Sequence, residues 1–180
     1  MRRGITSVIA VAAAVITVLI LSRRAPPENP PSSAARDWYR IASGRLHLDM
    51  RSTSPSAVSR FFVERGLPFR VDPGALSLPG YRLVGAHVHA VGGRRSALVV
   101  HRDARNKIVV CQTFEGRVED LPRADRVVLR NGARVHLYRL PGAAAAFWHD
   151  GTVTRSLASD LPEEEVVRLA FSATLPAGPP

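Results

Sequence analysis

The stretch YRLVGAHVHAVGGRRSALVVHRD, residues 81–103, decides how this chain folds. Two runs rich in Val, Leu and Ala flank the pair Gly92-Gly93, which is typical of two antiparallel strands joined by a tight turn. Alternate side chains of a strand point to opposite faces of its sheet. The first run therefore predicts two faces: Arg82, Val84, Ala86, Val88 and Ala90 on one, and Tyr81, Leu83, Gly85, His87, His89 and Val91 on the other.

The segments after this hairpin continue the same pattern. Strand-like runs at 96–103 and 107–114 are separated by a polar turn. Farther on, Asn131-Gly132 and Asp150-Gly151 each lie between two β-rich runs. Such pairs favour the positive φ angles of a type I′ hairpin turn. We therefore expect a meander of hairpins that forms a mostly antiparallel sheet.

Two segments carry helix signals. Residues 54–66 begin with Ser54, which can cap a helix, and end at Gly66, which can terminate one. Residues 159–173 place Asp160 and Pro162 at the start of an apolar stripe, followed by three glutamates that favour the positive end of the helix dipole. The fold class predicted for 54–173 is α+β, with two helices covering the sheet.

An uncharged apolar run precedes this domain at residues 4–21. At about 1.5 Å per residue such a helix is long enough to cross a thin bilayer, and the run is longer than the apolar part of a typical signal peptide. Arginines flank the run on both sides, so the signal for orientation is weak. We expect an uncleaved single-pass anchor whose N-terminus is cytoplasmic.

The chain then divides into four parts. These are an N-terminal membrane anchor (1–24), a Pro/Ser-rich linker with an irregular lead-in (25–53), the α+β domain (54–173) and a disordered tail (174–180). Within the linker, residues 25–36 hold four prolines, which predicts an extended, semi-rigid spacer.

Charge and cysteine content exclude several classes of protein. The formal net charge is +10, but the arginines are scattered and form no dense cluster, so we expect no nucleic-acid partner. Cys111 is the single cysteine, which excludes an intramolecular disulfide and a CxxC motif. Its apolar neighbours predict a partly buried strand residue.

His87 and His89 are the strongest candidates for a metal site. Residues two apart on a strand share a face, but a third ligand is needed. If Gly92-Gly93 forms a two-residue loop, His101 lies opposite Val84 on the other face. One extra loop residue would bring His101 onto the face of the other two histidines. The simplest hairpin therefore favours two solvated or partly packed histidines and no bound metal.

No catalytic motif is present. The sequence has no nucleophile elbow, no HExxH motif, no glycine-rich phosphate loop and no carboxylate pair in an apolar setting, so we expect neither an enzyme nor a cofactor. Phe147 and Trp148 are more typical of core aromatics, yet an exposed tryptophan would favour partner binding. We keep both as candidate partner-binding residues.

Residues 67–103 and 146–170, with a single span and a linker ahead of them, resemble the extracytoplasmic part of bacterial transmembrane anti-sigma factors. Proteins of that family carry a cytoplasmic sigma-binding domain, whereas only residues 1–3 precede the span here. The resemblance implies a regulatory sensor or partner-binding module in the bacterial inner membrane. Its domain would lie outside the cytoplasm and meet a protein partner there, and the family supplies no catalytic residues.

A second interpretation stays open. His87 and His89, with or without His101, could serve an envelope protein that handles metal or takes part in redox chemistry. Metal content of the purified protein separates this interpretation from the regulatory one.

Overall fold

The computed structural model describes residues 29–74, 76 and 78–174. The expected membrane span at 4–21 lies outside these residues, as does nearly all of the expected tail. Within the described ranges, no helix is long and apolar enough to cross a membrane.

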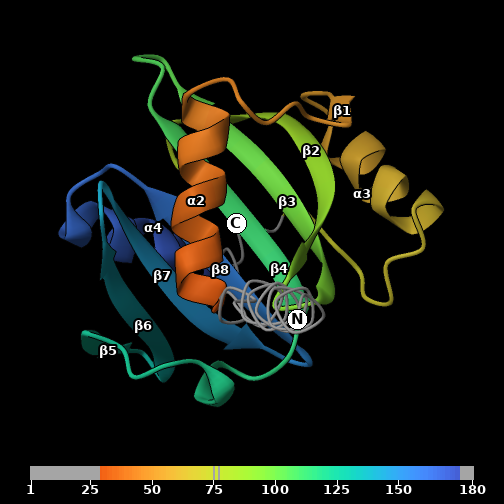
Figure 1. Cartoon of the computed structure of the whole chain (residues 1–180). Helices are drawn as coiled ribbons and strands as arrows, with labels where there is room; N and C mark the ends of the chain where they lie inside the picture. Colours follow the sequence, from red (N-terminus) through yellow and green to blue (C-terminus); the bar gives the residue numbers. More distant parts are fainter. Residues whose placement is uncertain (1–28, 75, 77, 175–180) are drawn as a thin grey trace, which may run out of the picture.

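One antiparallel sheet of eight strands organises the domain, in the order β1-β2-β3-β4-β8-β7-β6-β5 (Figure 1). The strands are β1 (Met50–Arg51), β2 (Tyr81–Val91), β3 (Arg94–Asp103), β4 (Ile108–Glu115), β5 (Arg126–Arg130), β6 (Ala133–Leu140), β7 (Ala143–Asp150) and β8 (Val153–Ser159). Strands β1–β4 form one meander and β5–β8 form another. The last strand of each meander, β4 and β8, pair with each other and join the two halves.

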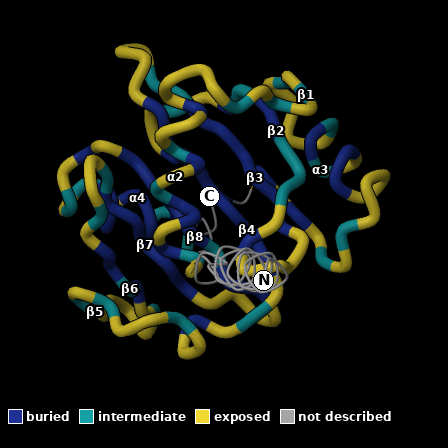
Figure 2. Tube along the Cα trace, in the orientation of Figure 1, coloured by how far each residue is buried: buried dark blue, intermediate teal, exposed yellow. Residues whose placement is uncertain are grey.

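Helices cover both faces of this sheet. The helices α3 (Pro55–Glu64) and α4 (Glu163–Thr174) contribute to one apolar core, and both were predicted from the sequence. A further helix, α2 (Pro30–Ala42), packs on the opposite face (Figure 1). The α+β class is confirmed, but the domain has three α-helices in three layers. Figure 2 shows the buried residues concentrated between these layers.

The expectation of an extended spacer at 25–36 is wrong for its described part. The side chain of Asn29 caps α2 by accepting a hydrogen bond from the backbone N–H of Ser32 at 2.9 Å. The prolines at 30 and 31 occupy the first turn, where a helix needs no backbone donor. Asn-Pro-Pro is thus the start of a helix here, although its composition resembles that of a linker.

Packing holds α2 against the sheet. Ala34 is buried among residues of β6, β7 and β8, and Ile41 is buried against β3 and β4. Trp38 lies between these two groups and donates from its indole Nε1 to the backbone oxygen of Ile108 at 3.1 Å. The helix therefore belongs to the folded domain and bridges both meanders.

Two hairpin turns form as predicted, at Gly92-Gly93 and Asn131-Gly132. The prediction for Asp150-Gly151 is wrong by one residue: Asp150 is the last residue of β7 and pairs with Val153, so Gly151 and Thr152 form that turn. Gly92 and Gly93 both have positive φ, 57° and 80°, and Asn131 and Gly132 have φ of 50° and 78°. These angles agree with the sequence-based expectation that both central residues of these turns occupy the left-handed region.

A bulge changes the predicted faces of β2. The pairs His89–Ser96 and His87–Leu98 follow from the two-residue Gly-Gly turn, as expected. Between Leu83 and Gly85 the register shifts, so that His101 pairs with Leu83 and not with Val84. The predicted alternation is therefore correct after the bulge and inverted before it: Leu83 lies in the core of α3 and α4, while Val84 packs on the α2 side.

Gly85 allows β1 to approach at this bulge. A Cβ atom at this position would lie 2.2 Å from the backbone oxygen of Met50 and 2.9 Å from the side chain of Leu48. Only glycine leaves room for the neighbouring backbone.

Candidate functional site

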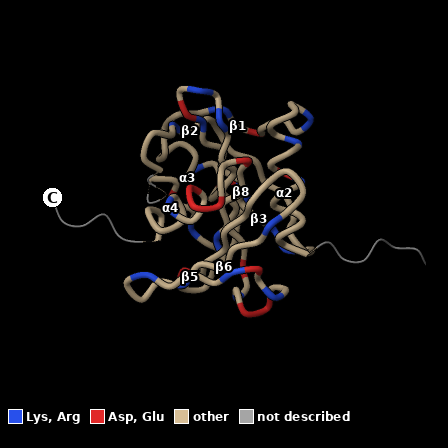
Figure 3. Tube along the Cα trace, turned by 90° about the vertical axis from the view of Figure 1, so that its left-hand side faces the viewer, with Lys and Arg blue, Asp and Glu red and all other residues tan. Residues whose placement is uncertain are grey.

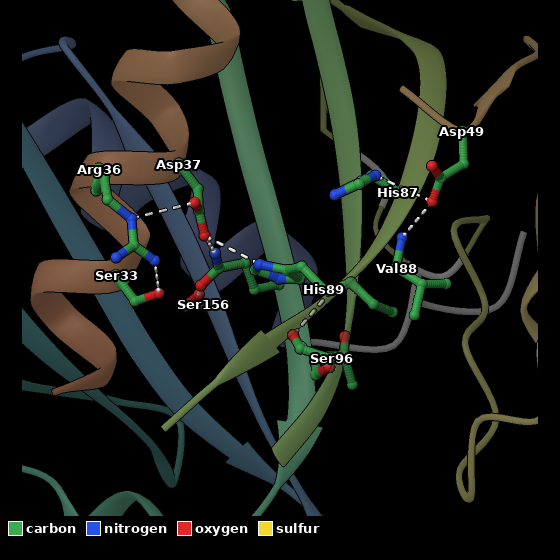
Figure 4. A network of polar contacts seen from close by, with 12 residues as sticks. Ser33, Arg36, Asp37, Asp49, His87, Val88, His89, Ser96 and Ser156 are labelled. Carbon is green, nitrogen blue, oxygen red and sulfur yellow. Dashed lines mark hydrogen bonds and ion pairs between the residues drawn. The ribbon is translucent and has the colours of Figure 1, made fainter. Parts of the chain in front are cut away.

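Two histidine–carboxylate pairs lie side by side on the α2 side of β2 (Figure 4). The rings of His87 and His89 have centroids 6.1 Å apart. The Nδ1 atom of His89 lies 3.1 Å from Oδ2 of Asp37, and Nδ1 of His87 lies 2.9 Å from Oδ2 of Asp49. Sequence reasoning found both histidines but missed both carboxylates, which come from the segment assigned to the linker.

Asp37 is the centre of a buried polar network. Its side chain is only 2% exposed. Gln112 on β4 donates from Nε2 to Oδ2 of Asp37 at 2.9 Å, and Ser156 on β8 extends the network by donating to Oε1 of Gln112 at 3.4 Å. Through these contacts one carboxylate connects α2 to three strands.

Two opposing effects set the pKa of Asp37. Burial raises this pKa, but the hydrogen bond with His89 and the electrostatic interactions with His89, Arg36 and Arg40 outweigh burial, so the pKa lies below its ordinary value. The Nε atom of Arg36 lies 3.6 Å from Oδ1 of the same carboxylate. The network therefore holds Asp37 as an anion inside the protein.

Asp49 forms a shallower version of the same arrangement. Its Oδ2 accepts a hydrogen bond from the backbone N–H of Val88 at 2.9 Å. Its pKa is lowered although burial acts to raise it, because this hydrogen bond and the electrostatic interaction with His87 have the larger combined effect. Since Asp49 lies on the approach to β1, this pair fixes the chain on its way into the sheet.

The geometry around His89 suits a structural role better than catalysis. An acid–base histidine needs a nitrogen that a substrate can reach. Nε2 of His89 is buried and has no hydrogen-bond partner among the described residues. Nδ1 faces Asp37 and Nε2 is buried. The imidazole therefore holds α2 against the sheet through its contact with Asp37.

His101 does not complete a metal site. It lies on the opposite face of the sheet, as the two-residue turn predicted, and it is buried there. Burial lowers the pKa of His101 to about 4. Among the described residues, no three His, Cys, Asp or Glu side chains are placed to hold a metal ion.

Phe147 and Trp148 both lie in the interior. Phe147 packs on the α2 side and makes an edge-to-face contact with Tyr138, with ring centroids 5.3 Å apart. Trp148 packs on the opposite side, in the core of α3 and α4. Neither ring offers its face to a partner, although Trp148 lines a cavity of about 350 Å³ together with Leu129.

The edge strand β5 is the surface that sequence reasoning missed. We use the name β5 edge for the outer side of Arg126–Arg130, because β6 is the only described strand that pairs with β5. Val127 and Leu129 are 46% and 65% exposed on this strand. They share the face of His136, where a cavity of about 430 Å³ opens beside Val127. The run RVVLR predicts a strand but cannot show that this strand is the outermost one.

The chain matches no protein-family model, no curated protein and no solved structure. The fold and the site geometry therefore carry the functional inference.

Proposed function

We propose that this chain is a membrane-anchored, extracytoplasmic module that binds a protein partner in a regulatory role. The feature that carries the proposal is the β5 edge. Helices cover both faces of the sheet, yet this margin leaves two large apolar side chains exposed. The proposal agrees with the resemblance of residues 67–103 and 146–170 to the extracytoplasmic part of transmembrane anti-sigma factors.

An open edge strand supports a protein partner for a physical reason. Its outward N–H and C=O groups have no neighbour among the strands that the structure describes, and an added strand can pair with them. The opposite margin, β1, has only two residues and offers little to pair with. β5 is longer, and its exposed residues lie at the outer margin of the molecule (Figure 2).

The position of α2 supports the regulatory part of the proposal. This helix follows the expected anchor in the sequence, within the segment that was assigned to the linker, and it contacts β4, β6, β7 and β8. A change in the second meander can therefore act on α2 through direct packing. Such a change would have to distort the buried contacts of Asp37 with Gln112 and His89.

A photo-crosslinking side chain placed at position 129 of the full chain tests the proposal in bacterial membranes. Position 63 is the matched control, since Val63 on α3 is 66% exposed against 65% for Leu129. We expect an adduct of one discrete mass from position 129 and none from position 63. Failure to form an adduct at position 129 overturns the proposed partner-binding role.

The orientation in the membrane has its own test. Protease added to spheroplasts should digest the α+β domain while the inner membrane is intact. Digestion that requires the inner membrane to be broken contradicts an extracytoplasmic domain.

The alternative, metal handling, is favoured by one observation. Metal-binding histidines commonly hold a carboxylate at the ring nitrogen that does not bind the metal, and both His87 and His89 have such a carboxylate. Metal analysis of the purified full chain and of a His87→Ala/His89→Ala double variant tests it. Equal metal content in the two proteins removes this candidate.

A further inference from the structure

We infer that the β5 edge binds an extended peptide segment of its partner, in which acidic residues flank an apolar–any–apolar core. The segment would add a ninth strand to the eight-stranded sheet. This inference rests on the proposed partner-binding function and specifies the chemistry of the partner.

The two faces of β5 differ in chemistry. Val127 and Leu129 point to the α2 side of the sheet, because they pair with His136 and Arg134 of β6. Arg126 and Arg130 point to the other side, where Val128 packs against the core. A strand added beside β5 therefore meets apolar side chains on one face and arginines at both ends of the other face.

The apolar face has room for partner side chains. The cavity of about 430 Å³ lies beside Val127 and is also lined by Leu121 and His136. The cavity of about 350 Å³ borders Leu129 but extends to the other side of the sheet, where Trp148 and Thr174 line it. Apolar residues opposite Val127 and Leu129 would remove both exposed side chains from water.

The arginines favour acidic residues at the ends of the segment. Arg126 pairs with Glu164 at 3.0 Å, but Glu164 is 79% exposed, so this ion pair is weak and open to exchange. Arg130 is exposed and contacts no acidic side chain among the described residues. Figure 3 shows basic residues at the outer end of β5. A carboxylate directly opposite each arginine makes a favourable cross-strand pair.

The same arginines disfavour a second copy of this chain as the occupant. Antiparallel pairing of two β5 strands centred on Val128 places Arg126 of each copy opposite Arg130 of the other. In-register parallel pairing also brings arginine next to arginine. Like charges directly opposite each other destabilise strand pairing, so self-association through this edge is penalised while an acidic partner is not.

Synthetic peptides test this inference on the full chain reconstituted in nanodiscs of zwitterionic lipid. A fluorescein-labelled peptide with the core Glu-Val-Thr-Val-Glu is compared by anisotropy with peptides carrying Lys-Val-Thr-Val-Lys or Glu-Thr-Val-Thr-Glu. We expect the first peptide to bind at least about tenfold more tightly than either control. Its affinity should also fall as salt is raised. Equal affinities for the glutamate and lysine peptides overturn the acidic pattern.

Two further comparisons locate the binding site. Leu129→Asp should weaken binding of the acidic peptide about tenfold or more, whereas Val63→Asp should leave it unchanged. Both variants should keep the thermal unfolding midpoint of the parent. Two series of peptides, N-methylated at odd or at even positions, should differ in binding. A strand directs alternate N–H groups toward its neighbour, so methylation of those that face β5 should abolish binding and methylation of the others should not. Equal effects of the two series overturn edge pairing.

The crosslinking experiment separates failure of this inference from failure of the proposed function. An adduct at position 129 in membranes, combined with no preference for the acidic peptide, overturns the peptide pattern and leaves a protein partner in place. Lack of the adduct overturns both. A concentration-dependent dimer that Leu129→Asp abolishes identifies a second copy as the occupant and also overturns the inference.

Discussion

Asp37 illustrates how a single side chain can secure a whole helix. It lies inside the protein, and the side chains of His89 and Gln112 both depend on its Oδ2 atom. A buried donor left without an acceptor carries the full cost of its lost hydration. The buried charge of Asp37 is thus stable in the fold because its hydrogen bonds and ion pairs replace the lost contacts with water.

Replacing Asp37→Ala should therefore lower the free energy of unfolding by about 1–3 kcal/mol. Urea denaturation at pH 7 measures the change, and the exposed Asp120→Ala is the control that should stay close to the parent. Because the folded protein lowers the pKa of Asp37 below 3.8, its contribution is complete above that pH and is lost as the pH falls through the folded pKa. A difference between parent and variant that does not shrink in acid contradicts this assignment.

His101 predicts a second and separate dependence on pH. Burial lowers its pKa from 6.5 to about 4, so the unfolded chain binds a proton more readily than the folded one between these values. Stability associated with the neutral ring is complete above pH 6.5 and is lost as the pH falls toward 4, by about 3 kcal/mol in total. His101→Leu should flatten the stability profile over this range, as measured by urea denaturation at several pH values. Equal profiles for His101→Leu and the parent would contradict the prediction.

The histidines also show which part of a site a sequence can predict. Two-residue periodicity and a Gly-Gly turn were enough to place His87 and His89 on one face and His101 on the other. The carboxylates could not be found in this way, because Asp37 reaches Gln112 across 75 positions of the chain. No local pattern predicts a contact of that range.

At the scale of elements, short sequence motifs were enough to predict the helices and turns that they determine locally. The capping residue Ser54 marked α3, the glutamates of its first turn marked α4, and Asn131-Gly132 marked a hairpin turn. The helix α2 was missed because proline-rich composition was interpreted as a spacer. The bulge in β2 was missed because strict alternation was assumed along the whole strand, and the register shift lies where β1 pairs with β2, a contact distant in sequence.

Gly85→Ala tests the close approach at the bulge. The added methyl group would meet the backbone oxygen of Met50, which cannot rotate away as a flexible side chain can. We expect a loss of about 1–3 kcal/mol in unfolding free energy and faster hydrogen exchange at β1. Ala90→Val, at an exposed position of the same strand, is the control. Slow exchange at β1 in the alanine variant would show that β1 does not depend on Gly85.

At the scale of the whole molecule, the pairing of β4 with β8 makes the two meanders one sheet. Cys111 pairs with Leu157 at this junction and is buried, and burial raises the pKa of its thiol to about 12. The chain thus carries a natural probe at the centre of the fold.

We expect Cys111 to react with a thiol reagent only when the domain unfolds. Its labelling should be about a thousandfold slower, or more, than that of a Ser43→Cys/Cys111→Ser control, whose thiol lies at an exposed position. Asp37→Ala should speed the labelling of Cys111 by the factor that corresponds to its loss of stability, while Leu129→Asp should not change the rate. Rapid labelling in the parent would show that the two meanders separate without global unfolding.

The joining of the meanders through their last strands also bears on how the protein is made. Val110 on β4 pairs with Ala158 on β8, which the ribosome adds only after β5, β6 and β7. During that interval the apolar run IVVCQTF has a free edge, in a topology where long-range pairing closes slowly. A nascent chain that stalls between β4 and β8 would expose this strand. We therefore expect the protein to be most prone to aggregation during its synthesis.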